Sequence, residues 1–476
     1  MEYEAVIGLE VHVELNTKTK IFCNCSTEFG QSPNSNVCPV CSGMPGVLPV
    51  LNQEVLNKAI LAGLALNGHI STFSRFDRKQ YFYPDLPKGY QISQLNFPIM
   101  ERGNVAIVDD GIEKIIQIHH MHMEEDAGKL IHSEDSSVKE SYVDLNRAGV
   151  PLVEIVSEPD MHTSKEAFLY LTEIKKIMKY IGVSDVNMEE GSLRCDANIS
   201  IRPKGEIKLG TKAEVKNMNS FHNVEKAIDY EIKRQKRVIE AGDKVMQETR
   251  LWNPDENKSY SMRSKEESND YRYFPEPDLV PIELSENEIE AMRERLPELP
   301  YSVKKRFLTD YKLTEDEATF LSAEKPMADF FEQTLNFFSD PKIISNWLTG
   351  AVTEYLNDKN VSIQNLNLSP EFLAELLELI KSDVISGTIG KKVLITSIER
   401  GQSPKSIVDS QGLKQVSNSD ELEKIVDEVL SENHDIVEKY RNGKIGVLGH
   451  LVGMVMRKTK GKANPKLCNE IFLKKL

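Results

Sequence analysis

The sequence predicts an α+β protein with a strand-rich first part and a wholly helical second part. Apolar and polar residues alternate with a period of two in residues 5–15 and 115–123, which is the pattern of half-buried strands. From about residue 290 the apolar spacing becomes helical and few strand signals remain. A length of 476 residues suggests about three domains, which we expect at 1–290, 291–405 and 406–476.

Helices should interrupt the strands of the first domain and make up the other two. Residues 53–66 and 164–181 have helical spacing within the first domain, and turn signals such as Asn-Gly at 67–68 separate the elements. The helices expected next are 286–295, 316–321, 328–338, 343–357 and 370–381. Those expected in the tail are 422–430, 436–442, 446–458 and a last helix after the turn at 460–465.

Composition indicates a soluble enzyme and not a general nucleic-acid binder. The chain is 40% hydrophobic and 28% charged, with a formal net charge of -15. Its start lacks the basic region of a signal peptide, and no apolar run reaches the roughly 18 residues of a membrane span. We therefore expect a cytoplasmic protein without membrane contact, whose cysteines are reduced or bound to metal.

The charge is uneven along the chain. Residues 441–476 contain nine Lys and Arg against one acid, a formal charge of +8 on an otherwise acidic protein. This predicts that the tail contacts a polyanion. The alternative is an ordinary solvated surface with lysine-rich helix ends.

Four cysteines have the spacing of a metal site. Cys23 and Cys25 form one pair, Cys38 and Cys41 form another, and twelve residues separate the pairs. Two such thiolate pairs can close a tetrahedral zinc site, and four thiolates leave no open position, so the zinc in this 23–41 loop would be structural. The alternative is four reduced loop cysteines.

Acidic residues recur on the expected strands. Glu10, His12 and Glu14 share one face of the first strand, and the other face is apolar. Further acids lie in 122–129, in 152–160, in 188–198 and at Glu214. Carboxylates in apolar strands are costly unless they are paired or bound to cations, and oxygen-rich clusters with one histidine suit Mg²⁺ or Mn²⁺. The alternative is half-exposed strands with ordinary salt bridges.

Basic residues beside aromatic rings could supply the complementary half of a phosphate site. They occur in 77–85, in 262–265 and in 270–278, where they could clamp phosphates or a nucleotide end, or line a tyrosine-rich core edge. No phosphate-binding glycine loop, dinucleotide fingerprint or serine-hydrolase elbow is present. Cys195 lies in an apolar and acidic strand, which should leave its thiol inert.

Together these blocks resemble the B subunits of the tRNA-dependent aspartyl/glutamyl amidotransferases. The resemblance runs along the whole chain through the blocks 6–15, 76–85, 90–94, 122–129, 154–160, 188–200, 270–278, 451–453 and 460–465. It implies a glutamine-synthetase-like cradle domain with a mixed sheet, then an all-α helical domain and a small all-α tail domain. The missing glutaminase nucleophile agrees with a division of labour between subunits.

The resemblance also implies an activity and partners. Such a chain is a carbon–nitrogen ligase that uses ATP and Mg²⁺ to phosphorylate the carboxylate of Glu or Asp esterified to tRNA. Ammonia from an amidase-type glutaminase subunit then displaces phosphate, and a small third subunit completes a heterotrimer. The products are Gln-tRNA(Gln) and Asn-tRNA(Asn), made from misacylated tRNA(Gln) and tRNA(Asn) for protein synthesis. The sequence does not distinguish which misacylated tRNA is the natural substrate.

Residue roles follow from the resemblance, position by position. The Mg²⁺ ligands would be Glu10, His12, Glu125, Glu154, Asp196 and Glu214. The catalytic group would be Glu10, His12, Lys79, Tyr81 and Glu125, with Lys79 and Tyr81 near the ammonia exit. The residues that bind ATP or substrate would be Lys88, Glu190, Arg263 and Arg272. The zinc ligands would be Cys23, Cys25, Cys38 and Cys41, although some family members lack this quartet.

Two other functions are compatible with these patterns. One is a non-catalytic tRNA-binding scaffold with a basic tail and a degenerate acidic site, against which the intact acids argue. The other is a stand-alone ammonia ligase that acts on a small acid. The basic tail and the missing glutaminase argue against the second.

Overall fold

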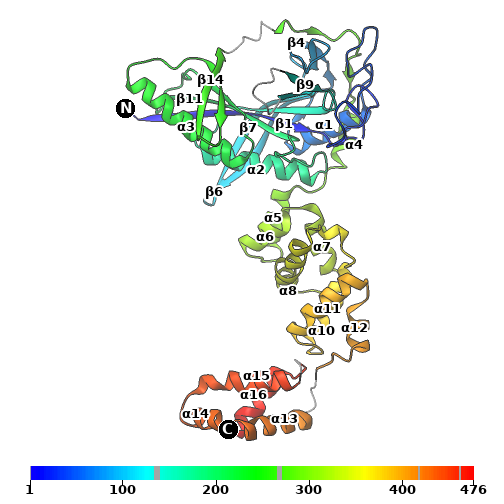
Figure 1. Cartoon of the computed structure of the whole chain (residues 1–476), viewed down its shortest axis with the longest axis vertical. Helices are drawn as coiled ribbons and strands as arrows, with labels where there is room; N and C mark the ends of the chain where they lie inside the picture. Colours follow the sequence, from blue (N-terminus) through cyan, green and yellow to red (C-terminus); the bar gives the residue numbers. More distant parts are fainter. Residues whose placement is uncertain (1, 133–139, 265–270, 416–418, 460–461) are drawn as a thin grey trace. The chain divides into compact units, whose positions relative to one another are not determined.

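The computed structural model describes residues 2–132, 140–264, 271–415, 419–459 and 462–476 (Figure 1). Its contacts divide the chain into two units, Met1–Leu299 and Pro300–Leu476. The first unit is mixed and the second is helical within the described residues, so the expected α+β class is confirmed. The division falls after 299 and not at the expected 290, and a separate tail from 406 stays a prediction.

A nine-stranded mixed sheet organises the first unit, in the order β14-β13-β12-β11-β1-β10-β7-β6-β2. Strands β12 and β13 are parallel, and every other neighbouring pair in this sheet is antiparallel. The bounds are β1 Tyr3–Glu14, β2 His69–Ile70, β6 Met100–Asp109, β7 Ile112–Glu125, β10 Pro151–Ser157, β11 Leu193–Pro203, β12 Ala213–Lys216, β13 Glu248–Asn253 and β14 Lys258–Ser264.

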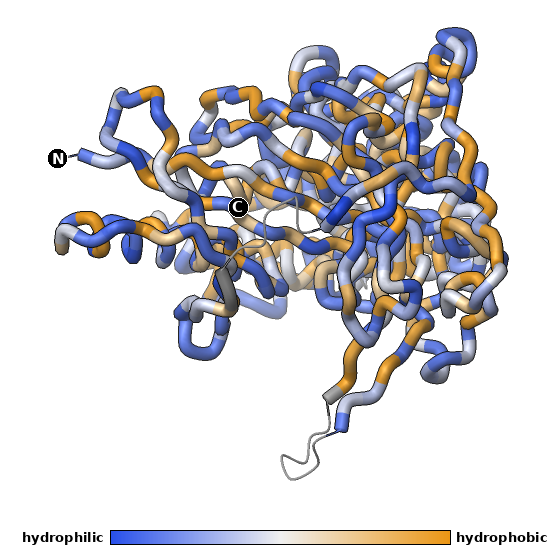
Figure 2. Tube along the Cα trace, turned by 90° about the horizontal axis from the view of Figure 1, so that it is seen from above, coloured by the Kyte–Doolittle hydropathy of each residue, from blue (hydrophilic) through white to orange (hydrophobic). Residues whose placement is uncertain are grey.

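Helices α2 (Ser164–Tyr180) and α3 (Phe221–Glu240) cover one face of this sheet (Figure 1). Each begins at a hydroxyl side chain that accepts a backbone N–H of the first turn, Thr163 for α2 and Ser220 for α3. The odd-numbered residues of β1, such as Val11, are buried in one core with residues of both helices. Hydrophilic and hydrophobic residues follow one another closely along the chain (Figure 2). Along β1 successive side chains point to opposite faces, so the even-numbered residues point to the uncovered face.

Smaller strands and helices complete the first unit. One small sheet has the order β15-β4-β5, with bounds Phe274–Pro275, Asp77–Gln80 and Tyr90–Ser93. Two strand pairs are β8 (Lys129–His132) with β9 (Ser141–Asp144), and β16 (Ile282–Glu283) with β3 (Phe73–Ser74). Helix α1 (Gln53–Ala65) contacts α4 (Glu286–Arg293), whose Ile289 and Met292 join the core of this unit. The helix expected at 286–295 therefore packs with the first unit.

The described part of the second unit contains helices and no strand. Their bounds are α5 Pro300–Thr309, α6 Glu315–Ser322, α7 Lys325–Leu335, α8 Pro341–Trp347, η2 Leu348–Val352, α9 Thr353–Lys359, η3 Ile363–Asn365, α10 Pro370–Lys381, α11 Gly387–Arg400, α12 Pro404–Ser410, α13 Ser419–Glu432, α14 His434–Arg441, η4 Ile445–Val447, α15 Leu448–Lys458 and α16 Pro465–Lys475. Helices α13, α15 and α16 share a small core of their own, around Leu451 and Phe472. No helix among the described residues has the length and apolar character that crossing a membrane requires.

Candidate functional site

The uncovered face of the large sheet gathers polar side chains from neighbouring strands. Strand β1 lies between β10 and β11, and in this register His12 is opposite Glu154 while Glu10 is opposite Asp196. Glu154 is in turn opposite His122 of β7. Directly opposed residues point to the same face of a sheet, so these side chains meet although up to about 190 residues separate them in sequence.

A first acid cluster consists of His12, Glu124 and Glu154, whose ligand atoms lie within 4.8 Å of one another. His12 Nε2 is 3.3 Å from Glu154 Oε2 and 3.7 Å from Glu124 Oε1. His122 flanks the same carboxylates, with its Nε2 3.3 Å from Glu154 Oε2 and 3.5 Å from Glu124 Oε2. Burial opposes the charge on Glu154, yet the two histidines hold the pKa of Glu154 well below its usual range. The same carboxylates raise the pKa of His122 to about 10 against the effect of its burial.

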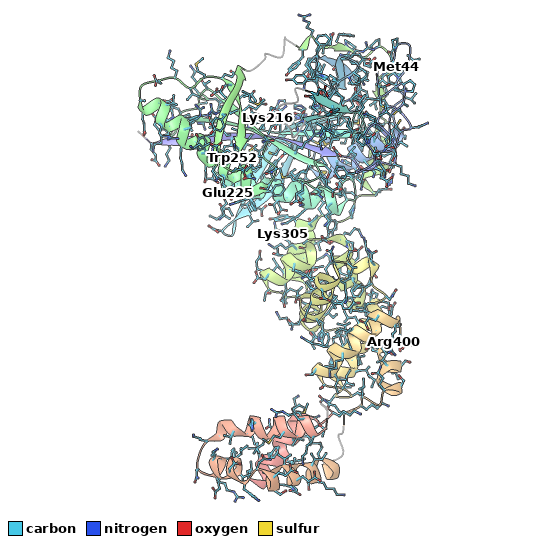
Figure 3. All side chains as sticks on the ribbon, viewed as in Figure 1. Met44, Lys216, Glu225, Trp252, Lys305 and Arg400 are labelled. Atoms are coloured by element: carbon cyan, nitrogen blue, oxygen red, sulfur yellow. The ribbon has the colours of Figure 1, made fainter. Side chains whose placement is uncertain are left out.

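A second acid cluster, Glu10, Asp196 and Glu214, lies on the same face, and its ligand atoms also fall within 4.8 Å of one another. Asn198 Nδ2 donates to Glu10 Oε1 over 2.8 Å, which orients the carboxylate. Lys216 Nζ (Figure 3) donates to Asp196 Oδ2 over 2.5 Å. Burial and then the neighbouring carboxylates raise the pKa of Glu10, since three acids repel one another with one lysine between them.

Both clusters fit a hard divalent cation. Each is rich in carboxylate oxygen and the first adds one imidazole, which is the donor set that Mg²⁺ and Mn²⁺ accept. In the second cluster three carboxylates share one lysine, and a bound cation would remove the cost of that excess negative charge. A cavity of about 210 Å³ lies beside Glu10, lined among others by Gly8, Asn198 and Lys212.

Among the described residues Glu125 does not belong to the first cluster, and its expected role as a metal ligand stays a prediction that this geometry does not support. Side chains alternate along β7, so Glu124 points to the acid clusters and Glu125 to the opposite side. There Glu125 forms an ion pair with Lys88 and accepts the Ile92 N–H over 2.9 Å. Glu124 was not expected from the sequence, although the period-two spacing His120-x-His122-x-Glu124 was a usable signal.

Lys79 and several tyrosines stand close to the first cluster. Lys79 Nζ lies 5.0 Å from the ring centroid of Tyr271, which contacts the Tyr81 ring edge to face at 6.2 Å. Burial disfavours the charged lysine, but the Tyr273 hydroxyl and the Glu124 and Glu154 carboxylates raise the pKa of Lys79. Burial likewise raises the pKa of Tyr81, so its hydroxyl stays a hydrogen-bond donor at neutral pH. Lys79 and Tyr81 therefore lie near the first cluster, and their expected place at an ammonia exit stays a prediction.

Two of the expected substrate residues, Arg272 and Glu190, are exposed, and a third, Arg263, has a side chain outside the described residues. Arg272 is exposed, and its carbonyl accepts Gln80 Nε2 over 3.0 Å. Glu190 is exposed on the loop before β11 and belongs to neither cluster. The Arg263 backbone pairs with Thr249, but its side chain lies outside what the structure describes.

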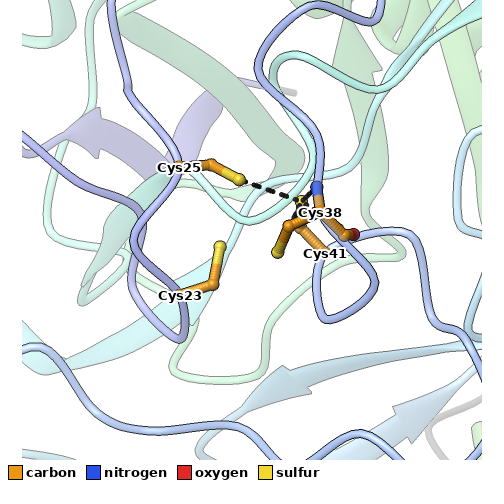
Figure 4. Close-up of side chains that lie close together, drawn as sticks. All are labelled: Cys23, Cys25, Cys38 and Cys41. Carbon is orange, nitrogen blue, oxygen red and sulfur yellow. Dashed lines mark hydrogen bonds between the residues drawn. The ribbon is translucent and has the colours of Figure 1, made fainter.

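The four paired cysteines converge as their spacing predicts (Figure 4). Cys41 Sγ lies 3.9 Å from both Cys25 Sγ and Cys38 Sγ, and all four sulfurs lie within 4.8 Å of one another. Tetrahedral zinc with bonds of about 2.3 Å places its sulfurs about 3.8 Å apart, so the quartet has the right dimensions. The backbone N–H of Cys38 donates to Cys41 Sγ over 3.2 Å, which favours a thiolate there.

A buried lysine offsets part of the negative charge of this quartet. Lys20 Nζ lies 3.6 Å from Cys41 Sγ and donates to Asn36 O over 2.8 Å. The Cys23 hydrogen bond is the largest of several effects, Lys20 among them, that lower the pKa of Cys41 to about 4. Cys195 is different: it is buried in β11, and burial raises the pKa of its thiol well above its usual value, as expected for an inert cysteine.

The basic end of the chain is partly neutralised within its own helices. Lys458 of α15 pairs with Glu428 and Glu432 of α13, and Lys475 pairs with Asp427. Five other basic residues are exposed there: Arg441, Lys444, Arg457, Lys466 and Lys474. Lys460 lies outside the described residues. An exposed basic surface is therefore present, with less excess charge than the composition indicates.

Comparison with known proteins gives the family. Residues 5–290 match the sequence profile described as the GatB/GatE catalytic domain, and residues 329–476 match that described as the GatB domain. The chain is 52% identical, over the full length of both, to the B subunit of the aspartyl/glutamyl-tRNA(Asn/Gln) amidotransferase of Thermoanaerobacter pseudethanolicus. It is 53% identical to that of Persephonella marina over 99% of both chains, and 51% to that of Crocosphaera subtropica over 100% of this chain and 98% of the other. The resemblance found in the sequence is thereby confirmed, and the chain belongs to the family of aspartyl/glutamyl-tRNA(Asn/Gln) amidotransferase B subunits.

Proposed function

We propose that this chain is the ATP-dependent ligase of tRNA-dependent transamidation, acting on Glu-tRNA(Gln), Asp-tRNA(Asn) or both. Its relatives are named as amidotransferase B subunits, which supports the substrate class. The observation that carries the chemistry is the pair of acid clusters on one sheet face, with Lys79 beside the first cluster. Two divalent cations held side by side would neutralise the charge of a transferring phosphoryl group.

The proposed reaction has two steps. A carboxylate oxygen of the esterified Glu or Asp attacks the γ-phosphorus of ATP, the bond from that phosphorus to the β–γ bridging oxygen breaks, and ADP leaves. Ammonia nitrogen then attacks the carbon of the phosphorylated side-chain carboxyl group. The bond from that carbon to the phosphate oxygen breaks, phosphate leaves, and the nitrogen loses one proton. Glu10, His12, Glu124, Glu154, Asp196 and Glu214 would hold Mg²⁺ for the first step.

The remaining residues receive roles from their positions. Lys79 and Tyr81 would receive ammonia, since the buried lysine and the tyrosine hydroxyl offer polar partners near the first cluster. The cavity beside Glu10 has room for part of a nucleotide. Lys88 and Glu125 would stabilise the wall behind the site through their ion pair. The cysteine quartet would hold structural Zn²⁺, because four thiolates fill a tetrahedral site.

The wider setting is proposed from the family. The first unit would be a glutamine-synthetase-like cradle, and the segment from 406 would be a tRNA-binding tail. The chain would work in the cytoplasm within a heterotrimer that includes an amidase-type glutaminase and a small third subunit. A non-catalytic scaffold is the alternative, but it gives no reason for two intact acid clusters.

The test is to purify the chain with its partner subunits and assay it on both misacylated tRNAs. Formation of Gln-tRNA(Gln) or Asn-tRNA(Asn) should require ATP and either glutamine or ammonium chloride. Glu154→Gln should abolish ATP cleavage and leave tRNA binding in place. Wild-type complex that binds tRNA without ATP-dependent product would favour the scaffold.

A further inference from the structure

Arg194 lies at the end of the sheet face that carries the two acid clusters, and the proposed reaction gives it no role. It lies on β11 directly opposite His12, so both side chains point to the face that carries the acid clusters. Its side chain is 34% exposed, which places the guanidinium partly in the protein and partly open to a bound molecule. A cation in this position is next to the first cluster without being one of its members.

The guanidinium has hydrogen-bonding capacity left over. Arg194 Nη2 donates to Asp126 Oδ2 over 2.7 Å, which fixes the orientation of the group. Its Nε is buried and has no hydrogen-bond partner among the described residues. The buried Nε is covered by protein, so the donors within reach of a bound molecule lie on the exposed part of this side chain, which is 34% exposed.

Arg147 provides a comparison within the same structure. It contacts the same Asp126 carboxylate, with Nε 3.3 Å from Oδ2. Its donors, however, are used by the backbone, since Nε donates to Ala127 O over 3.0 Å and Nη2 to Gly128 O over 2.7 Å. Arg147 therefore ties the chain together after β7, whereas Arg194 keeps a donor for another molecule.

We propose that Arg194 binds an oxyanion of the substrate beside His12, either a carboxylate oxygen of the esterified amino acid or an oxygen of the transferring phosphoryl group. This inference rests on the proposed function. A guanidinium presents donors in a planar fork that matches carboxylate and phosphate oxygens, and Asp126 holds one edge of that fork in place. Lys79 and Lys216 already place charge near the clusters, and Arg194 adds a planar donor group that neither lysine has.

The experiment compares Arg194→Lys and Arg194→Met with the matched control Arg147→Lys in the complete complex. Ammonium chloride is the nitrogen donor, so that the glutaminase does not limit the rate. Arg194→Lys keeps the charge and loses the fork, and we expect kcat/KM to fall about tenfold or more. Arg147→Lys also weakens one contact to Asp126. It should shift the melting temperature about as much as Arg194→Lys does, but change kcat/KM less than about twofold.

The parameter that changes identifies the oxyanion. A higher KM for misacylated tRNA indicates the carboxylate, a higher KM for ATP indicates the γ-phosphate, and a lower kcat with both KM values unchanged indicates contact in the transition state. Equal effects of the Arg194 and Arg147 variants on kcat/KM, or no effect of Arg194→Met, would overturn the inference. The activity of the wild-type complex would still support the proposed function in that case. An inactive wild-type complex would instead remove the proposed function itself. If Arg194→Met does not fold, Arg194→Lys alone decides.

Discussion

Glu124 and Glu125 are neighbours in sequence, and the structure predicts opposite consequences for the same substitution. Glu124 faces His12 and Glu154, whereas Glu125 faces Lys88 and the backbone of β5. Glu124→Gln removes one negative charge from the first cluster and keeps the side-chain volume. Glu125→Gln removes an ion pair whose side chains are 4% and 12% exposed.

The magnitudes follow from these environments. Loss of a charged ligand at a phosphoryl-transfer site removes roughly 3 kcal/mol of transition-state stabilisation, so Glu124→Gln should lower ATP cleavage about 100-fold. Breaking a buried ion pair costs about 3–5 kcal/mol. The amide oxygen of Gln can still accept the Ile92 N–H, so we expect a loss of about 2–3 kcal/mol of stability for Glu125→Gln.

Two measurements separate the variants. Urea unfolding gives the free energy of unfolding of each chain, and ATP cleavage dependent on misacylated tRNA gives the turnover of each complex. Glu124→Gln should turn over slowly, whereas Glu125→Gln should turn over nearly like wild type and lose stability; Glu124→Gln also loses some stability, since it removes a partner of His12 and His122. Normal turnover in Glu124→Gln, together with a slow but stable Glu125→Gln, would refute the assignment of faces along β7.

Three further outcomes are expected. Purified chain should contain one zinc, and Cys38→Ser should lose it and melt at a lower temperature, whereas freely titratable thiols and no zinc in wild type would contradict the site. Deletion of residues 406–476 should raise the KM for tRNA and leave kcat nearly unchanged. It should also flatten the salt dependence of tRNA affinity by about one unit of log–log slope for each phosphate interaction removed. If the deleted and full-length chains bind tRNA equally at two salt concentrations, the basic residues of the tail are ordinary surface. Burial, followed by the Asp126 charge, raises the pKa of Glu14 from 4.5 to about 8, so the folded chain holds a proton that the unfolded chain releases. The stability of wild type should therefore fall between about pH 4.5 and pH 8 relative to Glu14→Gln, and parallel stability curves for the two would show that Glu14 does not carry this proton.

The sequence alone determined the local features. Period-two alternation located β1 and β7, since a half-buried strand must alternate polar and apolar residues. Helical spacing located α1, α2 and α10 to within one residue at either end. The cysteine spacing predicted the convergence of four sulfurs, because each pair needs only a tight turn and the two pairs need only one loop closure.

Tertiary structure decided which acids meet. Glu10, Asp196 and Glu214 form one cluster because β11 lies between β1 and β12, and strand order is set by long-range pairing that periodicity does not encode. The choice of Glu124 over Glu125 depends on the register of β7, which turns Glu124 toward His12 and Glu154 and Glu125 toward Lys88. The donor that Arg194 keeps becomes visible only when Asp126 is placed beside it. Residue types and spacing therefore predicted which strands carry the acids, and the sheet register determined which of these acids meet.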